Sequence, residues 1–248
     1  MNLSLSKSSA LMQFKTRELL KNKSFLVGIL LPIGFILVYR FGLADLFSDK
    51  ETRAMGFSLI LKMGILFTIC MIALMMPATL LAKDKEKHTL RTLMTSSVSG
   101  MDYFVSTVIP VVVVTVLSNV VVLLLSGIPL EEVNLLTYFL AIFLATLTTC
   151  VIGMIVGIFS KDQMAASNNM VFFMMVLMMV PMFSDMFAGL QTVNQYLYTG
   201  ILATMTTEIA SGNKNPLAML DWVILVASCL VFFVIFLIVY RKNGFEKD

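Results

Sequence analysis

Charged residues are scarce in this sequence of 248 residues, because Asp, Glu, Lys and Arg together make up 13% of it. A soluble domain carries about 25% charged residues. Hydrophobic residues reach 58%, and none of the long apolar runs alternates apolar with polar residues as a membrane β-barrel strand does. The composition therefore excludes a soluble enzyme, a disordered protein and a secreted disulfide scaffold, and it disfavours a membrane barrel.

Motifs for catalysis and metal binding are also missing from the sequence. It contains no G-x-x-x-x-G-K-[ST] phosphate loop, no H-E-x-x-H, no G-x-S-x-G and no cluster of Cys and His. His88 is the only histidine, and its charged surroundings favour a solvated position. Cys70, Cys150 and Cys229 lie in separate apolar runs, where thiols behave as small hydrophobes. We therefore expect no catalytic residue, metal site or cofactor in this chain.

Six long apolar segments stand in place of such motifs. They cover residues 25–43, 56–82, 103–126, 135–159, 168–188 and 220–240. Each holds about 20 residues or more, which is enough for an α-helix to cross the hydrocarbon layer. Gly153 and Gly157 in the fourth segment form a G-x-x-x-G pattern, which permits close helix approach. The sequence predicts an all-α, polytopic membrane protein in which residues 1–248 form a single transmembrane domain with six spans.

Lysine and arginine are distributed unevenly over the connections between these segments. Five precede the first segment, four follow the second, one follows the fourth and three lie in the C-terminal tail, so one side holds 13 of the 18. The other side holds the remaining five. Because positive charge accumulates on the cytoplasmic side of membrane proteins, both termini and the loop at 83–102 are predicted to be cytoplasmic.

The connection between the fifth and sixth segments, residues 189–219, is long but not polar. It mixes apolar and aromatic side chains with small polar ones. That mixture suits short helices that dip into the outer membrane interface. An ordinary ordered external loop is the alternative interpretation.

Candidate residues of a substrate pathway come from two of the apolar segments. Lys62 lies about one and a half turns inside the second segment, where it either reaches back to the interface or takes part in a pathway or an ion pair. Met174, Met178 and Met182 share one helix face at i, i+4 spacing. That face is either filler against lipid and neighbouring helices or a pliable wall for a hydrophobic or amphipathic substrate.

The stretch from Lys83 to Ser99 is the most informative polar part of the sequence. Leu90, Leu93 and Met94 follow i, i+3, i+4 spacing, so a short helix here has one small apolar face and a charged remainder. Such a helix can dock into a groove of a partner protein. The alternative is a solvated loop without a partner.

This stretch resembles the membrane subunits of ABC transporters of the type-2 permease class. Those proteins carry a pattern close to E-[RK]-x-x-T-L-x-x-L-[LM]-x-[ST]-P-[VIL]-[ST] just after their second span. The residues that match it are Glu86, Lys87, Thr89, Leu90, Leu93, Met94, Ser96, Val98 and Ser99. Ser97 stands where the family usually has proline, and His88 stands where it often has glycine.

The beginning of the chain is similar to the same family. Residues 17–24, followed by Leu31-Pro32, look like the family's interfacial helix, here 1–24, entering its first span. As a free helix, 7–22 is only weakly amphipathic, because Lys15, Glu18 and Asn22 interrupt its apolar side.

The resemblance implies the membrane permease of an ATP-driven ABC exporter, with ATP and magnesium bound by separate ATPase subunits. The segment 84–97 would be the coupling helix that contacts the ATPase, through Glu86, Lys87, Thr89, Leu90, Leu93, Met94 and Ser96. The segment 189–219 would form re-entrant helices at the outer face. A second permease subunit, identical or related, would complete the pathway. Membrane lipid is the other implied partner, and nucleic acid is not.

The implied location is the bacterial cell membrane, and the compact, Lys-rich chain looks most like the bacterial exporters of peptides and bacteriocins. Some of these export amphipathic toxins such as phenol-soluble modulins, so a peptide is the favoured substrate. Two alternatives stay open, an ATP-independent carrier or channel and a membrane-embedded enzyme, anchor or immunity protein. The mid-membrane positions offer no carboxylate, which counts against an ion-coupled carrier.

Overall fold

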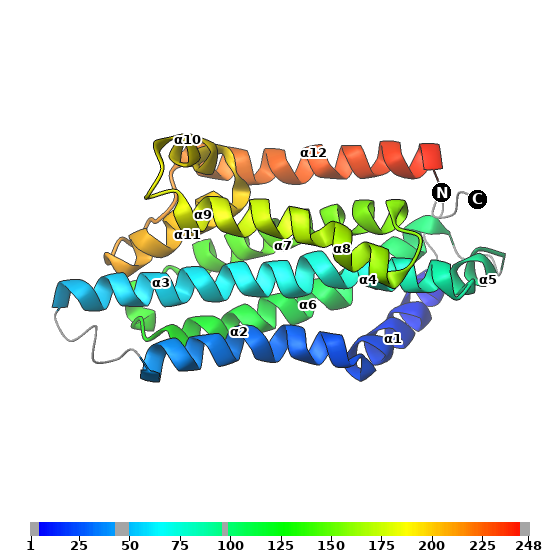
Figure 1. The fold of residues 1–248 in the computed structure, drawn as a ribbon, viewed down its shortest axis with the longest axis horizontal. Helices are drawn as coiled ribbons and strands as arrows, with labels where there is room; N and C mark the ends of the chain where they lie inside the picture. The colour runs from blue at the N-terminus through cyan, green and yellow to red at the C-terminus, as the bar shows by residue number, and fades with distance from the viewer. Residues whose placement is uncertain (1–4, 43–49, 96–98, 244–248) are drawn as a thin grey trace.

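The computed structural model describes residues 5–42, 50–95 and 99–243, and its long helices lie side by side along the long axis of the molecule (Figure 1). Six helical segments are long and apolar enough to cross a membrane, namely Phe25–Gly42, Met55–Glu86, Gly100–Ser126, Leu135–Phe159, Gln163–Phe183 and Met219–Lys242. These segments confirm the prediction of an all-α, polytopic membrane protein with six spans.

The six spans run up and down in chain order, and two of them each contain two of the described α-helices. The α-helices of the described residues are named in chain order. They are α1 (Leu5–Lys21), α2 (Lys23–Gly42), α3 (Lys50–Thr68), α4 (Met75–Glu86), α5 (Thr89–Thr95), α6 (Gly100–Ser126), α7 (Leu135–Phe159), α8 (Gln163–Met174), α9 (Val180–Phe183), α10 (Ala188–Tyr196), α11 (Tyr198–Ala210) and α12 (Met219–Asn243). One end of the molecule carries α1, α5 and the C-terminal end of α12, and we call it the α5 end (Figure 1). The opposite end carries α10, and we call it the α10 end.

Two spans contain a π-helical segment shortly before a proline. The segment η2 (Ile69–Leu74) joins α3 to α4 ahead of Pro77, and η4 (Met175–Met179) joins α8 to α9 ahead of Pro181. Proline lacks the backbone N–H and its ring clashes with the carbonyl four residues earlier. A π-helical turn inserts an extra residue and relieves that clash, so both spans continue through their prolines.

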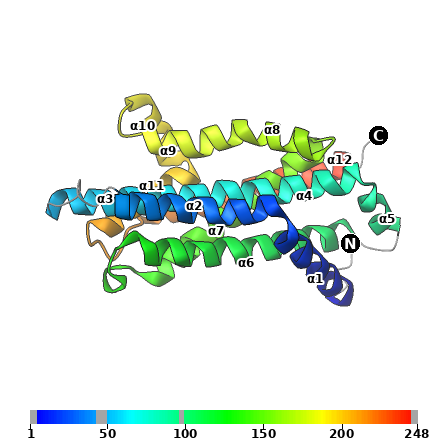
Figure 2. The same cartoon turned by 60° about the horizontal axis from the view of Figure 1, so that its bottom comes forward.

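The second and fourth spans form the centre of the bundle. In α7, a Cβ atom added at Gly153 would overlap the carbonyl oxygen of Leu74, and one added at Gly157 would lie 3.0 Å from the carbonyl oxygen of Ala78. The G-x-x-x-G pattern therefore lets α7 contact the backbone of η2 and α4 directly. Figure 2 shows α8, α9 and α10 along one side of this centre, and α1 leaving the α5 end at an angle to α2.

The segment after the fifth span forms two short helices, α10 and α11, at the α10 end. The start of α11 is buried, and the hydroxyl groups of Tyr198 and Thr149 lie 3.0 Å apart. Because Thr149 lies near the middle of α7, α11 begins well inside the bundle. Trp222, near the start of α12, packs against the buried cluster that includes Leu202 of α11. Among the described residues, this segment therefore forms short helices, of which α11 extends into the bundle.

The end of the second span differs from its prediction. Residues 83–86 were expected in a loop and 84–97 in a single helix, but α4 continues through Glu86 and α5 starts anew at Thr89. Between them His88 has a φ of 55°, a left-handed conformation that a right-handed helix cannot include. Glycine adopts this conformation without strain, which agrees with the glycine often found here in the permeases that this stretch resembles. Residues 96 and 97, the end of the expected helix, lie outside the described residues.

Candidate functional site

Four consecutive residues at the end of α4 bond to neighbouring helices at the α5 end. Successive residues of an α-helix point about 100° apart, so four in a row reach around most of its circumference. They are Lys83, Asp84, Lys85 and Glu86, and we call them the junction residues. The sequence predicted a cytoplasmic loop with a partner-docking helix at these positions, and a solvated loop was the alternative. The structure places them among α1, α5, α6, α7 and α8.

Asp84 is the most buried junction residue, with 5% of its surface exposed. Its carboxylate forms an ion pair with Lys15 of α1, which is fully buried. It also accepts a hydrogen bond from the hydroxyl of Tyr103 in α6 and one of 3.1 Å from Thr89 at the start of α5. A buried carboxylate is stable only when it is paired and hydrogen-bonded. Asp84 therefore requires α1, α5 and α6 to stay in place together.

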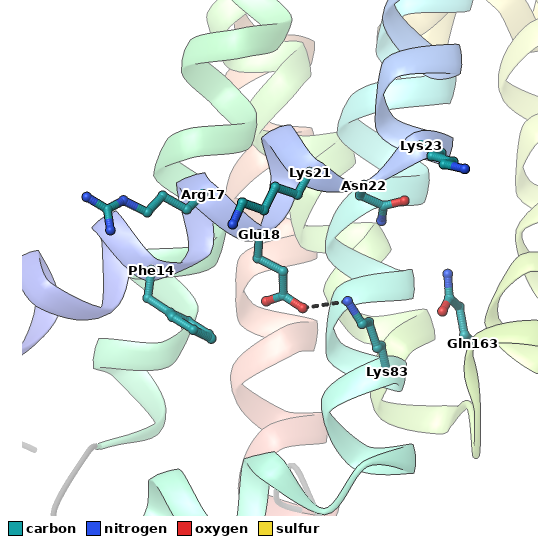
Figure 3. A pocket seen from close by; sticks show the side chains of 8 residues that line it. All are labelled: Phe14, Arg17, Glu18, Lys21, Asn22, Lys23, Lys83 and Gln163. Carbon is teal, nitrogen blue, oxygen red and sulfur yellow. Dashed lines mark hydrogen bonds and ion pairs between the residues drawn. The ribbon is translucent and has the colours of Figure 1, made fainter.

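Glu18 on α1 forms a second link to the same corner. Its carboxylate lies 3.1 Å from the ammonium of Lys15. It also lies 2.7 Å from the ammonium of Lys83, a contact that Figure 3 shows. Burial alone would raise the pKa of Glu18, but the two neighbouring lysines outweigh it and hold that pKa below its usual 4.5. Glu18 is therefore a carboxylate at neutral pH and bridges α1 to α4.

Lys85 and Glu86 connect α4 to the corner between α7 and α8. The Lys85 ammonium donates hydrogen bonds of 2.7 and 2.8 Å to the carbonyl oxygens of Ile158 and Ser160, at the C-terminal end of α7. Such carbonyls have no partner within their own helix and attract cations. Glu86 accepts a bond of 3.1 Å from the backbone N–H of Gln163, at the start of α8.

Apart from Leu90, the residues predicted to contact an ATPase fall into three groups in the structure. Glu86, Lys87 and Thr89 are exposed at the α5 end. Leu93 is partly buried and lines a groove of about 390 Å³ together with Phe14, Lys87 and Thr92. The side chain of Met94 and all of Ser96 lie outside the described residues.

The position of Leu90 differs from the prediction that it belongs to an outward apolar face of α5. Its side chain is fully buried and belongs to a cluster with Leu11, Leu80 and Tyr103 of the same chain. The i, i+3 spacing suggested that Leu90 and Leu93 point outward together. The break at His88 turns α5 back onto the bundle, so Leu90 packs against the chain itself and Leu93 stays at the edge.

Lys62 lies at the other end of the molecule in a polar environment. Its side chain is 9% exposed, and its ammonium lies 3.6 Å from the carboxylate of Asp185, which is 79% exposed. Lys62 and Asp185 border two adjoining cavities of about 270 and 300 Å³. Other lining residues are Ser58, Ser184, Gln191, Asn194, Thr207 and Glu208. The side-chain oxygen of Asn194 is buried and has no hydrogen-bond partner within the described part of the chain.

The three candidate methionines do not lie on one regular helix. Met174 ends α8, Met178 lies in η4 and Met182 lies in α9, so the i, i+4 spacing crosses a π-helical segment. The extra residue in that turn rotates the positions away from a single α-helical face. All three are partly buried, and Met174 and Met178 pack against the main buried cluster.

The Lys15–Asp84 pair is the feature of this site that the sequence did not predict. One signal was present, since Lys15 and Glu18 interrupt the apolar side of the N-terminal helix. A lysine there implies either exposure or a buried acidic partner. The partner lies 69 positions away in the sequence, and periodicity does not reveal such a distant contact.

Comparison with known protein families matches residues 55–238 to the family described as ABC-2 family transporter protein. Comparison with curated proteins gave no match. The matched part runs from the second span into the sixth, and it contains the junction residues, α5, Lys62 and the helices α10 and α11. Because the match covers well over half of the chain, this protein belongs to the ABC-2 family of transporter proteins.

Proposed function

We propose that this chain is the permease of an ATP-driven exporter. Its family makes it a membrane permease subunit of an ABC transporter. In our proposal, separate ATPase subunits bind ATP and magnesium, and a second permease subunit, identical or related, completes the pathway. The complex moves a hydrophobic or amphipathic substrate, with a peptide favoured, out of a bacterial cytoplasm. Both termini and the α5 end face that cytoplasm.

The observation that carries this proposal is the junction between α4 and its neighbours. A displacement of α5 would move Thr89, which bonds to Asp84. Asp84 in turn bonds to Lys15 of α1 and Tyr103 of α6. Lys85 and Glu86 extend the connection to α7 and α8. Because every link is a charged or charge-assisted hydrogen bond, the elements move as a unit when α5 moves. ATP-driven conformational change at the α5 end would in this way reach the spans.

The pathway in this proposal includes the polar cavities beside Lys62. A buried ammonium whose ion pair is 3.6 Å long, next to an unsatisfied Asn194 oxygen, leaves hydrogen-bonding capacity for a polar group of the substrate. The flexible methionines of α8, η4 and α9 would contact its apolar part. Together these features suit a substrate with separate polar and apolar parts, as an amphipathic peptide has.

The proposal is tested by purifying the chain together with the ATPase subunit that copurifies with it from native membranes. We expect no ATP hydrolysis by the chain alone, and ATP-dependent uptake of an amphipathic peptide into inside-out vesicles that contain both subunits. Uptake that needs only a proton gradient, with no ATPase bound, would point to a carrier instead. If an ATPase is bound but no peptide is taken up, the permease role is retained and the proposal of a peptide substrate is rejected.

Leu93→Asp is the variant that probes the contact with the ATPase. We expect it to lose ATPase binding in a pull-down and ATP-driven uptake, because a carboxylate at the edge of the groove carries a desolvation cost in an interface. Thr192→Asp places the same charge on an exposed position of α10 and is expected to bind the ATPase normally. Equal binding by both variants would contradict a role of α5 in coupling. Leu90 does not serve this purpose, because its substitution would disturb the chain's own packing.

A further inference from the structure

A basic cavity of about 690 Å³ lies at the elbow where α1 meets α2. Figure 3 shows Arg17, Lys21 and Lys23 along this elbow, with Lys83 and Gln163 across from it. Phe14, Glu18 and Asn22 complete its lining. This cavity and the groove beside Leu93 share Phe14, Glu18 and Lys83. Arg17, Lys21 and Lys23 line the cavity but not the groove.

The charges around this cavity are not balanced. The lining holds four cationic side chains and one carboxylate, and that carboxylate, Glu18, already bonds to Lys15 and Lys83. Arg17, Lys21 and Lys23 are exposed, and among the residues that the structure describes none of the three has a carboxylate within ion-pair distance. Arg17 and Lys21 are also four residues apart on one helix, where like charges repel. An anion in the cavity would relieve this repulsion.

The position of the cavity indicates which kind of anion is available. Lys23 precedes the first span by two residues, so the cavity lies at the level of the lipid headgroups. Phe14 and Leu20 of α1 are 60% and 55% exposed, as expected for a helix that lies in the membrane interface. Arginine binds phosphate with two parallel hydrogen bonds, and lysine adds point charges. Basic pockets at this depth bind anionic lipid headgroups in other membrane proteins.

We propose that this cavity binds the phosphate-bearing headgroup of an anionic phospholipid through Arg17, Lys21 and Lys23. The inference rests on the membrane location of the chain and goes beyond the proposed transport function. Arg17 and Lys21 are both on α1, so a headgroup bound to them relieves their mutual repulsion and stabilises this helix. Glu18 on the same helix bonds to Lys83, and α1 is thereby connected to the junction. The lipid thus becomes part of the α5 end.

The test uses the full chain in nanodiscs of phosphatidylcholine with increasing phosphatidylglycerol, with bound lipid counted by native mass spectrometry after transfer to detergent. The variant is Arg17→Gln/Lys21→Gln/Lys23→Gln. Its control is Lys214→Gln/Arg241→Gln/Lys242→Gln, which removes three exposed cations elsewhere and changes net charge equally. We expect the unmodified chain and the control to retain phosphatidylglycerol. Each lost contact should weaken binding about fivefold, and all three together up to about a hundredfold.

Two further measurements keep the result unambiguous. The three single Gln variants should each weaken phosphatidylglycerol binding, which covers the case in which the triple variant does not fold. Inorganic phosphate alone should protect the chain from thermal unfolding far less than phosphatidylglycerol at equal concentration. Equal protection by inorganic phosphate would show that the cavity binds a soluble anion and not a lipid headgroup. Equal loss of lipid from the variant and the control would overturn the site and leave only general surface charge.

Discussion

At the residue scale, Lys15 and Asp84 form an ion pair inside the protein, away from solvent. Both are taken out of water, and each has the other as its charged partner in the described structure, together with Glu18 for Lys15. Removing one member of such a pair leaves an uncompensated buried charge, which costs far more than an exposed pair contributes. The stability of the α5 end therefore depends on a contact between α1 and α4 that is buried on both sides.

Asp84→Asn is predicted to destabilise the protein by up to about 3–5 kcal/mol, because Lys15 loses the more buried of its two counter-charges in the described structure and keeps Glu18. Lys15→Met in the same chain should restore part of this loss, since the buried ammonium that has lost Asp84 is then gone. The measurement is thermal unfolding in detergent for both single variants and the double variant. Strictly additive effects of the two substitutions would show that the pair is not coupled.

Glu18 gives the α5 end a dependence on pH. Its pKa is lower in the folded chain than its usual 4.5, because Lys15 and Lys83 outweigh its burial. A lowered pKa contributes stability above the unfolded value, and this contribution is lost as the pH falls through the folded pKa. We predict that Glu18→Gln lowers the melting temperature at pH 7, and that the difference from the unmodified chain shrinks steadily below pH 4.5. A difference independent of pH would contradict the ion pairs of Glu18.

At the element scale, α7 approaches the η2–α4 part of the second span closely enough for backbone to meet backbone. This approach depends on the missing side chain of Gly153, because a Cβ there meets backbone rather than a movable side chain. Backbone does not yield without shifting a whole helix. The spacing of Gly153 and Gly157 predicted a close contact, but it did not identify the partner helix.

Gly153→Ala is predicted to cost about 1–3 kcal/mol of stability through overpacking. Gly34→Ala in α2 is the matched control, since a Cβ there has no atom within 4 Å. We expect the control to lose nothing, because alanine is the better helix former. The two variants are compared by thermal unfolding and by the yield of monodisperse protein. Equal stability would show that α7 has room to move away from Leu74.

The break between α4 and α5 shows where local prediction failed. Residues 83–86 carry alternating charges, and that composition favours a solvated loop. In the folded chain each of these charges has a specific partner on another helix, and this is a tertiary property. His88 likewise has no sequence signal strong enough to end a helix. The six spans were predictable because each depends only on local apolar composition, whereas the junction depends on which helices meet.

At the scale of the whole molecule, the two ends differ in character. At the α5 end, ion pairs join α1 to α4, and hydrogen bonds of Lys85 and Glu86 join α4 to α7 and α8. The α10 end holds polar cavities and the inward-pointing start of α11. The sequence predicted short dipping helices at 189–219 from composition alone. It did not predict the contact of Tyr198 with Thr149, because that contact depends on how α11 inserts between other spans.

The distribution of Lys and Arg predicts that Lys87 is cytoplasmic and Asn213 is external. Both side chains are exposed, so each can be replaced by cysteine for labelling. The background needs the three native cysteines replaced, namely Cys70, Cys150 and Cys229. In intact cells a membrane-impermeant maleimide should label Asn213→Cys and should leave Lys87→Cys unlabelled until the cells are opened. Labelling of Lys87→Cys in intact cells would reverse the topology.

Trp222 packs against the core near α11, so its fluorescence can report a conformational change at this place. It is the only tryptophan in the sequence, so the tryptophan emission of each permease chain, excited beyond the absorption of its six tyrosines, comes from one place. That place is at the α10 end, whereas the junction lies at the α5 end (Figure 1). With an ATPase partner stripped of its tryptophans, any shift in emission wavelength on adding nucleotide would be a signal that has travelled the length of the bundle, read without attaching a dye.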